Sequence, residues 1–216
     1  MPRMSGKTIL AALVVLFLLT PFIESMPNGD LVEAIAITVV LVAGVGATGG
    51  NPRAMAGAAL LAIPAVIGRW LHYLAPGLVH PGVYLAVAVM AMVYITLRFV
   101  VYVMRAERVT SDVLCTGLSA FLMIALLWAF GYIMVDRLVP GSFLYTVGPV
   151  HEMTGFVALY FSLVTQCTVG FGDIVPVSNA ARTLAMFQGA VGVIFIAVML
   201  ARLVSLYSAE KAQAGY

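Results

Sequence analysis

Residues 168–173, with the sequence TVGFGD, interrupt an otherwise apolar part of the chain with two glycines and a carboxylate. Glycine adopts backbone angles that residues with side chains resist. Hard cations prefer oxygen ligands, and backbone carbonyls supply them. We therefore predict that carbonyl groups here point toward a common axis and replace the hydration shell of an ion. The carbonyls in question belong to Thr168, Val169, Gly170 and Phe171.

The composition indicates that this stretch lies in a membrane protein. Of the 216 residues, 63% are hydrophobic and 9% are charged, whereas a soluble domain carries roughly 25% charged residues. The formal net charge of +2 is too small to indicate nucleic-acid binding. Both cysteines, Cys115 and Cys167, lie in apolar stretches, which argues against a disulfide framework.

Six apolar stretches are long enough to cross a membrane, because a helix of about 20 residues spans the hydrocarbon core. They cover residues 7–24, 31–48, 54–74, 82–104, 113–135 and 181–207. If the N-terminus lies inside, most lysines and arginines fall on the cytoplasmic side, where they are usually enriched. We therefore predict an all-α membrane protein with six transmembrane helices and with both termini in the cytoplasm.

A shorter apolar segment, residues 155–167, leads directly into the TVGFG sequence. This segment is too short to cross a membrane and indicates a helix that enters from outside and returns to the same side. Irregular backbone at membrane depth is tolerated only where it is buried in protein or lines a water-filled cavity. We therefore predict a re-entrant pore helix and filter between the fifth and sixth transmembrane helices.

The TVGFGD sequence resembles the selectivity filter of potassium channels, with Phe171 where tyrosine is more common. Residues 158–204 look like the pore helix, filter and inner helix of that superfamily, and the layout is similar to that of small bacterial six-helix channels. The resemblance implies passive potassium conduction, no enzymatic activity, and no cofactor other than the permeant potassium ions, which residues 168–171 would bind. Gly172 completes the filter. Four filter strands are needed to surround an ion, so a cyclic homotetramer is expected.

The resemblance also implies two domains. Residues 1–108 would form a peripheral four-helix domain with the layout of a voltage sensor, and residues 109–216 would form the pore domain. The expected partners are the lipid bilayer and other copies of the chain, with no nucleic acid and no soluble ligand-binding domain in this chain. The expected location is the cell membrane (inner or plasma membrane).

Four residues are expected to support the filter: Tyr160, Thr165, Cys167 and Asp173. Related channels often pair a ring donor with the filter aspartate, so a hydrogen bond between Tyr160 and Asp173 is expected. Cys167 replaces a threonine of the usual Thr-x-Thr-Thr run, and a thiol is a weaker hydrogen-bonding group than a hydroxyl. Because Phe171 also lacks a phenol, the filter is expected to be less rigid while remaining selective for potassium.

The gating candidates are Gly192, Ala201 and Val204, all in the last helix. Gly192 aligns with the inner-helix hinge of the family, although close helix packing explains a glycine there equally well. The other two lie where the inner helices would converge and close by dewetting. In the fourth helix, Arg98 is the sole charge in a register where voltage sensors carry arginine at every third position. Conduction is therefore expected to depend weakly on voltage.

Two alternative classes of protein remain open: a different cation channel, and a membrane enzyme or secondary transporter. A non-selective or sodium-conducting cation channel could use the same scaffold, although the complete TVGFG sequence argues against it. A membrane enzyme would need a nucleophile–base pair or metal ligands at membrane depth, and the spans contain no deep histidine or paired carboxylates. A transporter would show two similar halves with matching broken helices, and the sequence has one break.

Overall fold

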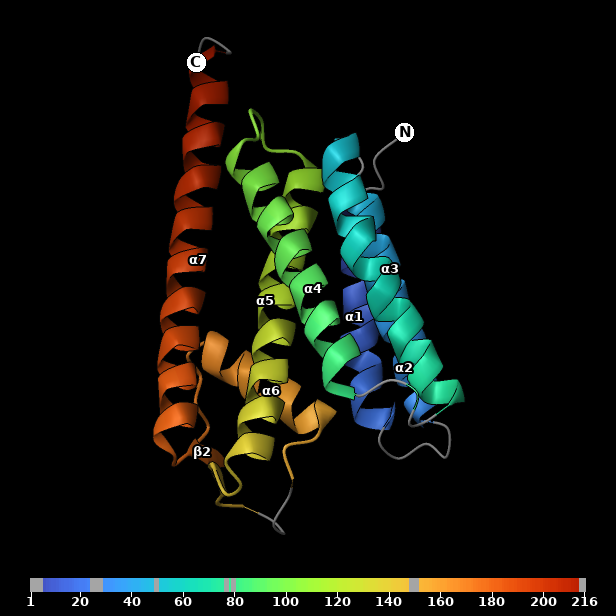
Figure 1. The fold of residues 1–216 in the computed structure, drawn as a ribbon. Coiled ribbons are helices and arrows are strands. Elements are labelled where there is room, and N and C mark those ends of the chain that lie inside the picture. Colours follow the sequence, from blue (N-terminus) through green and yellow to red (C-terminus); the bar gives the residue numbers. More distant parts are fainter. Residues whose placement is uncertain are drawn as a thin grey trace. The chain divides into compact units, whose positions relative to one another are not determined.

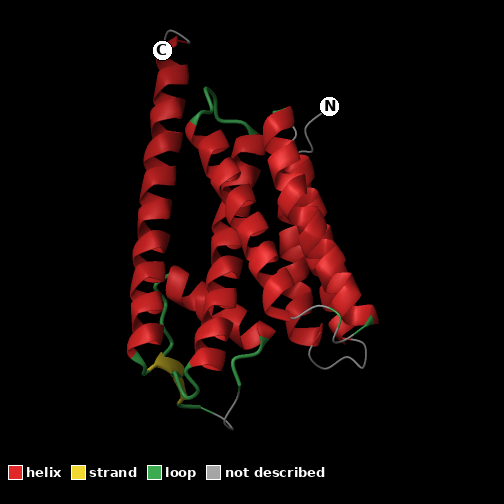
Figure 2. Cartoon of the chain, in the orientation of Figure 1, coloured by secondary structure: helices red, strands yellow, loops and turns green. Residues whose placement is uncertain are grey.

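The computed structural model describes residues 6–23, 29–48, 51–75, 78, 81–147 and 152–213. Most of these residues are helical (Figure 2). The chain packs as two compact units, Met1–Met123 and Ile124–Tyr216, which divide inside one long helix. The predicted division at residues 108 and 109 separates a peripheral function from a pore function. A division by packing does not test it, so it stays a prediction.

The elements follow the predicted apolar stretches closely (Figure 1). In the described part of the chain they are α1 (Gly6–Ile23), α2 (Gly29–Ala47), α3 (Pro52–Leu74), α4 (Pro81–Met104), α5 (Ser111–Leu138), β1 (Phe143–Tyr145), α6 (Gly155–Gln166), β2 (Ile174–Pro176) and α7 (Asn179–Gln213). The helical character of all six predicted spans and of the short segment before the filter is confirmed. Residue 24, the predicted end of the first span, lies outside the described residues.

Five of these helices are long and apolar enough to cross a membrane: α1, α3, α4, α5 and α7. The apolar part of α2, Ala34–Ala47, is shorter than these five helices. A chain with several such helices is a multi-pass membrane protein. The sixth span and the entry of α6 into the membrane stay predictions.

In the first unit, small residues allow α3 and α4 to pack closely. Asn51 begins α3 by accepting a hydrogen bond from the Arg53 N–H at 3.0 Å, and Pro52 follows as its first residue. A Cβ atom on Gly68 would lie 2.6 Å from the Tyr84 Cβ. Small residues at an interface let two membrane helices approach closely, so this face of α3 packs directly against α4. The buried residues of α3 are Ala54, Ala58, Ala62, Ala65 and Gly68.

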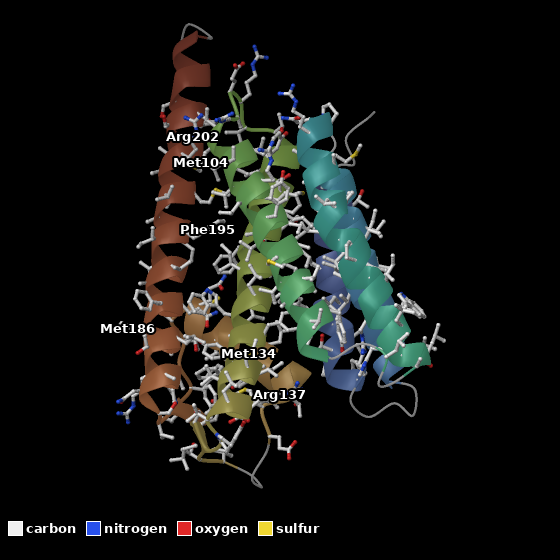
Figure 3. All side chains as sticks on the ribbon, viewed as in Figure 1. Met104, Met134, Arg137, Met186, Phe195 and Arg202 are labelled. Atoms are coloured by element: carbon white, nitrogen blue, oxygen red, sulfur yellow. The ribbon has the colours of Figure 1, made fainter. Side chains whose placement is uncertain are left out.

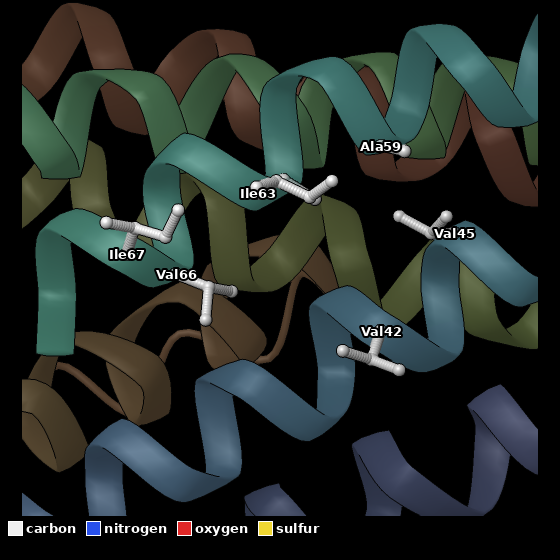
Figure 4. A pocket seen from close by; sticks show the side chains of 7 residues that line it. Val42, Val45, Ala59, Ile63, Val66 and Ile67 are labelled. Carbon is white, nitrogen blue, oxygen red and sulfur yellow. The ribbon is translucent and has the colours of Figure 1, made fainter.

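Between α2 and α3 the first unit has an apolar groove of about 270 Å³ (Figure 4). Its lining consists of Val42, Val45, Ala59, Ala62, Ile63, Val66 and Ile67. The two helices are also joined by a hydrogen bond from Trp70 Nε1 to Thr38 Oγ1 at 3.1 Å. An entirely aliphatic lining suits helices that pass through a bilayer, where an unpaired polar group would be costly.

The second unit is built around three aromatic rings from three different elements. Tyr132 of α5, Phe143 of β1 and Phe161 of α6 pack edge to face, with ring centroids 4.8 to 5.8 Å apart. Such pairs add to the stability that area burial provides. The strands β1 and β2 pair in antiparallel fashion, with Tyr145 opposite Ile174. The all-α prediction did not include this small sheet, which joins the segment before α6 to the segment after it.

Candidate functional site

The short helix α6 passes directly into the TVGFG sequence. The backbone N–H groups of residues 167–169 donate to the carbonyls of Leu163, Thr165 and Val164, at 2.9, 3.0 and 2.9 Å. These bonds occupy carbonyls that would otherwise lack partners at the end of a helix. They also fix the first residues of the filter to the last turn of α6.

The backbone of the filter alternates in handedness. Thr168, Gly170 and Gly172 have φ angles of 57°, 55° and 81°, while Val169 and Phe171 between them do not have positive φ. Thr168 is the one residue other than glycine, among those described, with a positive φ. In a regular strand successive residues point to opposite sides, and so do their carbonyls. Reversing the sign of φ at every second residue turns the peptide planes, so that successive carbonyls can face the same side. The backbone therefore fits the predicted row of oxygens.

The outer end of the filter is joined to α6 by the hydrogen bond expected from the sequence. The Tyr160 hydroxyl donates to Asp173 Oδ2 at 2.7 Å, which confirms that bond. This hydrogen bond, together with burial and the negative charge of Asp173, raises the pKa of Tyr160 to about 12. The ring of Phe171 stacks on that of Tyr160, with centroids 6.4 Å apart and planes 5° apart. Phe171 therefore contacts α6 through its ring rather than through a phenol.

The segment after β1 supplies a contact to residues 172 and 173 that sequence reasoning missed. Thr146 follows β1, and its hydroxyl donates to the carbonyl of Gly172 at 2.8 Å. Its N–H donates to the carbonyl of Asp173, also at 2.8 Å. These bonds draw the Gly172 carbonyl toward the loop, although an oxygen with two lone pairs can accept a second partner. The role of Gly172 as an ion ligand stays a prediction.

The other predicted support residues lie close to the filter. Thr165 is half-buried in the last turn of α6, and Cys167 is a free thiol that is exposed in the single chain. The side chains of Val169 and Phe171 are also exposed, at 53% and 69%. These residues follow one another along one continuous segment, and the supporting roles of Thr165 and Cys167 stay predictions.

A buried polar network behind the filter also escaped the sequence analysis. Gln188 of α7 accepts a hydrogen bond from the Tyr132 hydroxyl at its Oε1. Its Nε2 donates to the carbonyl and hydroxyl oxygens of Ser162, at 2.9 and 2.6 Å, and lies 3.3 Å from Gln166 Oε1. Ser162 Oγ donates in turn to the Ala125 carbonyl at 2.6 Å. The available signal was an amide in the middle of an apolar span, which is costly without partners.

Gly192 lies where α7 touches the end of α6. A Cβ atom there would lie 2.3 Å from the carbonyl oxygen of Gln166, whereas a Cβ on Gly189 would meet nothing within 4 Å. Close packing therefore accounts for Gly192 in this chain, and its role as a hinge stays a prediction. Ala201 and Val204 are exposed on the same helix, Val204 at 56%. Their role as a gate is likewise untested.

Removal of the Tyr160 hydroxyl is expected to weaken the outer end of the filter. The Tyr160→Phe variant loses a hydrogen bond to a carboxylate, an interaction of about 1.5 kcal/mol or more. The current should therefore decay roughly tenfold faster during sustained opening, as measured in bilayer recordings. Tyr94→Phe is the matched control, because it removes a phenol that bonds to the Ala54 carbonyl in the first unit. Unchanged decay in Tyr160→Phe would contradict the expectation.

Comparison with known proteins places the site within one matched segment. Residues 120–209 match the model of a family described as ion channel. The chain is 38% identical to two pore potassium channel c of Oryza sativa subsp. japonica over 88 residues. This aligned segment is 41% of this chain and 19% of the relative. Over 65 residues it is 43% identical to two-pore potassium channel 1 of Arabidopsis thaliana, covering 30% and 18%.

A third relative, two-pore potassium channel 4 of Arabidopsis thaliana, is 46% identical over 48 residues, or 22% of this chain and 17% of the relative. The chain thus spans less than a fifth of the length of these curated relatives. No solved structure matches the chain significantly. Residues 120–209 are therefore similar to the pore segments of potassium channels, and the apolar helices indicate a multi-pass membrane protein.

Proposed function

We propose that the protein is a potassium-selective channel that lets potassium ions pass down their gradient through a pore made by four copies of the chain. The observation that carries this proposal is the alternating backbone at Thr168, Gly170 and Gly172 within a TVGFG sequence. A row of carbonyls facing one axis can replace the water around a dehydrated cation. The similarity to two-pore potassium channels supports the choice of ion.

The exposure of α7 supports an assembly of several copies. In the single chain, 11% of the residues in an apolar stretch of α7 are buried, compared with 50% in a similar stretch of α5. Met186, labelled in Figure 3, is 63% exposed, and Ile194 on the same helix is 61% exposed. In a cyclic tetramer this face would line the pore and contact neighbouring copies.

We further propose a location in the cell membrane, inner or plasma, with both termini in the cytoplasm, following the distribution of basic residues. The inner gate would lie where α7 bends at Gly192 or where Ala201 and Val204 of four copies converge. A narrow ring of apolar side chains can stop ion flow by excluding water. Large cations applied from the cytoplasm should reach the cavity of a closed channel when the filter is the gate, and be kept out when α7 is.

Reversal potentials measured with purified protein in a planar bilayer test the proposed selectivity. With potassium on one side and sodium on the other, the current should reverse far from zero, at a voltage whose sign opposes the flow of potassium down its gradient. Native mass spectrometry should show four chains per particle. A channel that passes sodium as readily as potassium would be the non-selective alternative, and a monomer would contradict the shared pore.

The same recordings test the weak voltage dependence. Arg98 is half-buried on α4, and the positions that precede it at three-residue spacing, Met92 and Ile95, are apolar and fully buried. Moving one charge through the membrane field is worth about 2.3 kcal/mol per 100 mV, and full sensors move three or four in each subunit. In symmetrical potassium the conductance should change gradually between about −100 and +100 mV. A steep sigmoidal rise would contradict this part of the proposal.

A further inference from the structure

We propose that Gln188 is a positioning residue for the filter. Its side-chain amide holds α6 in a fixed position between α5 and α7, and this position keeps the filter in its conducting and selective form. The inference rests on the proposed potassium conduction, and it extends that function to a residue far from the TVGFG sequence along the chain.

The amide of Gln188 uses both of its halves. The oxygen accepts from Tyr132 of α5, and the nitrogen donates to Ser162 of α6. The side chains of all three residues are fully buried, each with 0% exposure. A glutamine amide offers two acceptor sites and two donor hydrogens, so one side chain can join both neighbouring helices at once. A methionine of similar length could fill the space but would make none of these hydrogen bonds.

The network reaches the filter through the last turn of α6. Gln188 Nε2 lies 3.3 Å from the side-chain oxygen of Gln166, the residue that ends this helix. Gly192, one helical turn further along α7, would place a Cβ atom 2.3 Å from the carbonyl oxygen of the same residue. α7 therefore touches the end of α6 at two successive turns. A change in the tilt of α7 has to move Gln166 and, through the bonds to residues 167–169, the start of the filter.

A purely structural role for the network makes a different prediction from a positioning role. Buried polar groups in a membrane protein stabilise helix packing wherever they occur. If Gln188 did no more than that, its loss would lower the yield or the thermal stability of the assembly and leave the ion selectivity of surviving channels unchanged. If it positions the filter, the surviving channels should have altered selectivity.

The test compares four variants by their potassium-to-sodium permeability ratio in the bilayer. Gln188→Met should lower the ratio by about tenfold, the effect expected when buried partners lose a hydrogen bond. Ser162→Ala, a smaller change, should also lower the ratio. Tyr132→Phe should lower it less, because the hydrogen bond between Gln188 and Ser162 remains. The double variant Gln188→Met/Ser162→Ala should be no worse than Gln188→Met alone, because the two residues share one interaction.

Ser119→Ala is the matched control. Ser119 is also fully buried, but its hydroxyl donates to Cys115 of its own helix at 2.8 Å, so its loss should leave the ratio unchanged. A wild-type ratio in both Gln188→Met and Ser162→Ala would overturn the proposal. An equal fall of the permeability ratio in Ser119→Ala would also overturn it, because the loss of any buried hydroxyl would then lower the ratio.

Hydrogen exchange separates this inference from the proposed function. In lipid nanodiscs, the amides of residues 162–169 should exchange about tenfold faster in Gln188→Met than in the wild-type protein, and at the wild-type rate in Ser119→Ala. This measurement requires no current. If the wild-type protein conducted no potassium, the proposed function would fail, and the exchange rates would still decide whether Gln188 holds α6. Unchanged exchange in Gln188→Met would overturn the positioning role.

Discussion

Replacement of Gly192 by alanine is expected to separate α7 from the end of α6 and to abolish the potassium current. The added Cβ would lie 2.3 Å from the Gln166 carbonyl oxygen and 3.1 Å from its carbonyl carbon, and the backbone there cannot rotate away as a side chain could. Overpacking of this kind costs typically about 1–3 kcal/mol, and the proposed tetramer would contain it four times. The measurements are the midpoint of thermal unfolding, the fraction of protein that remains tetrameric, and the current per reconstituted channel.

Gly189→Ala provides the control one turn earlier. Apart from its own helix, no described residue lies within 4 Å of the added Cβ, and alanine in a helix interior is about 1 kcal/mol more favourable than glycine. The control should therefore keep the wild-type stability or exceed it. A Gly192→Ala protein with unchanged stability and filter selectivity but altered opening would contradict the packing explanation and favour the hinge.

Replacement of Gly170 by alanine is expected to abolish selectivity for potassium over sodium. Gly170 has a φ of 55° in the middle of the filter, and an alanine there pays about 1–2 kcal/mol for the left-handed conformation. Relaxation of this strain rotates the flanking peptide planes, so that the carbonyls of Val169 and Gly170 leave the row. The reversal potential should then approach the value for a channel that does not distinguish the two ions.

Gly141→Ala is the matched control for backbone strain. Gly141 has a φ of 78° and, like Gly170, has nothing within 4 Å of an added Cβ, but it lies before β1 and outside the filter. Its variant should lose a similar amount of stability and keep the wild-type reversal potential. If Gly170→Ala also kept its selectivity, the carbonyl row would not be what selects the ion.

Much of the fold could be predicted because it depends on short stretches of sequence. Apolar runs of membrane length became helices whose ends lie within a few residues of those expected, except that α7 continues beyond residue 207 to Gln213. The 155–167 segment formed a helix too short to span, and the hydrogen bond between Tyr160 and Asp173 is present. The resemblance to potassium channels carried the last prediction, and it could do so because both residues belong to one continuous segment that matches the family pattern.

The sequence by itself determined the membrane character, the helices and the break in helical structure at the TVGFG segment, because hydropathy and the glycine spacing act through neighbouring residues. Only the tertiary structure decided which distant polar groups form hydrogen bonds to α6 and to the TVGFGD segment. Gln188 and Ser162 are 26 residues apart, as are Thr146 and Gly172, and nothing local pairs them. The sequence around Gly192 is equally consistent with a hinge and with close packing, and the contact with the Gln166 carbonyl favours packing. Such contacts depend on how whole helices pack, and in a membrane a buried polar group must find its partner wherever that packing places one.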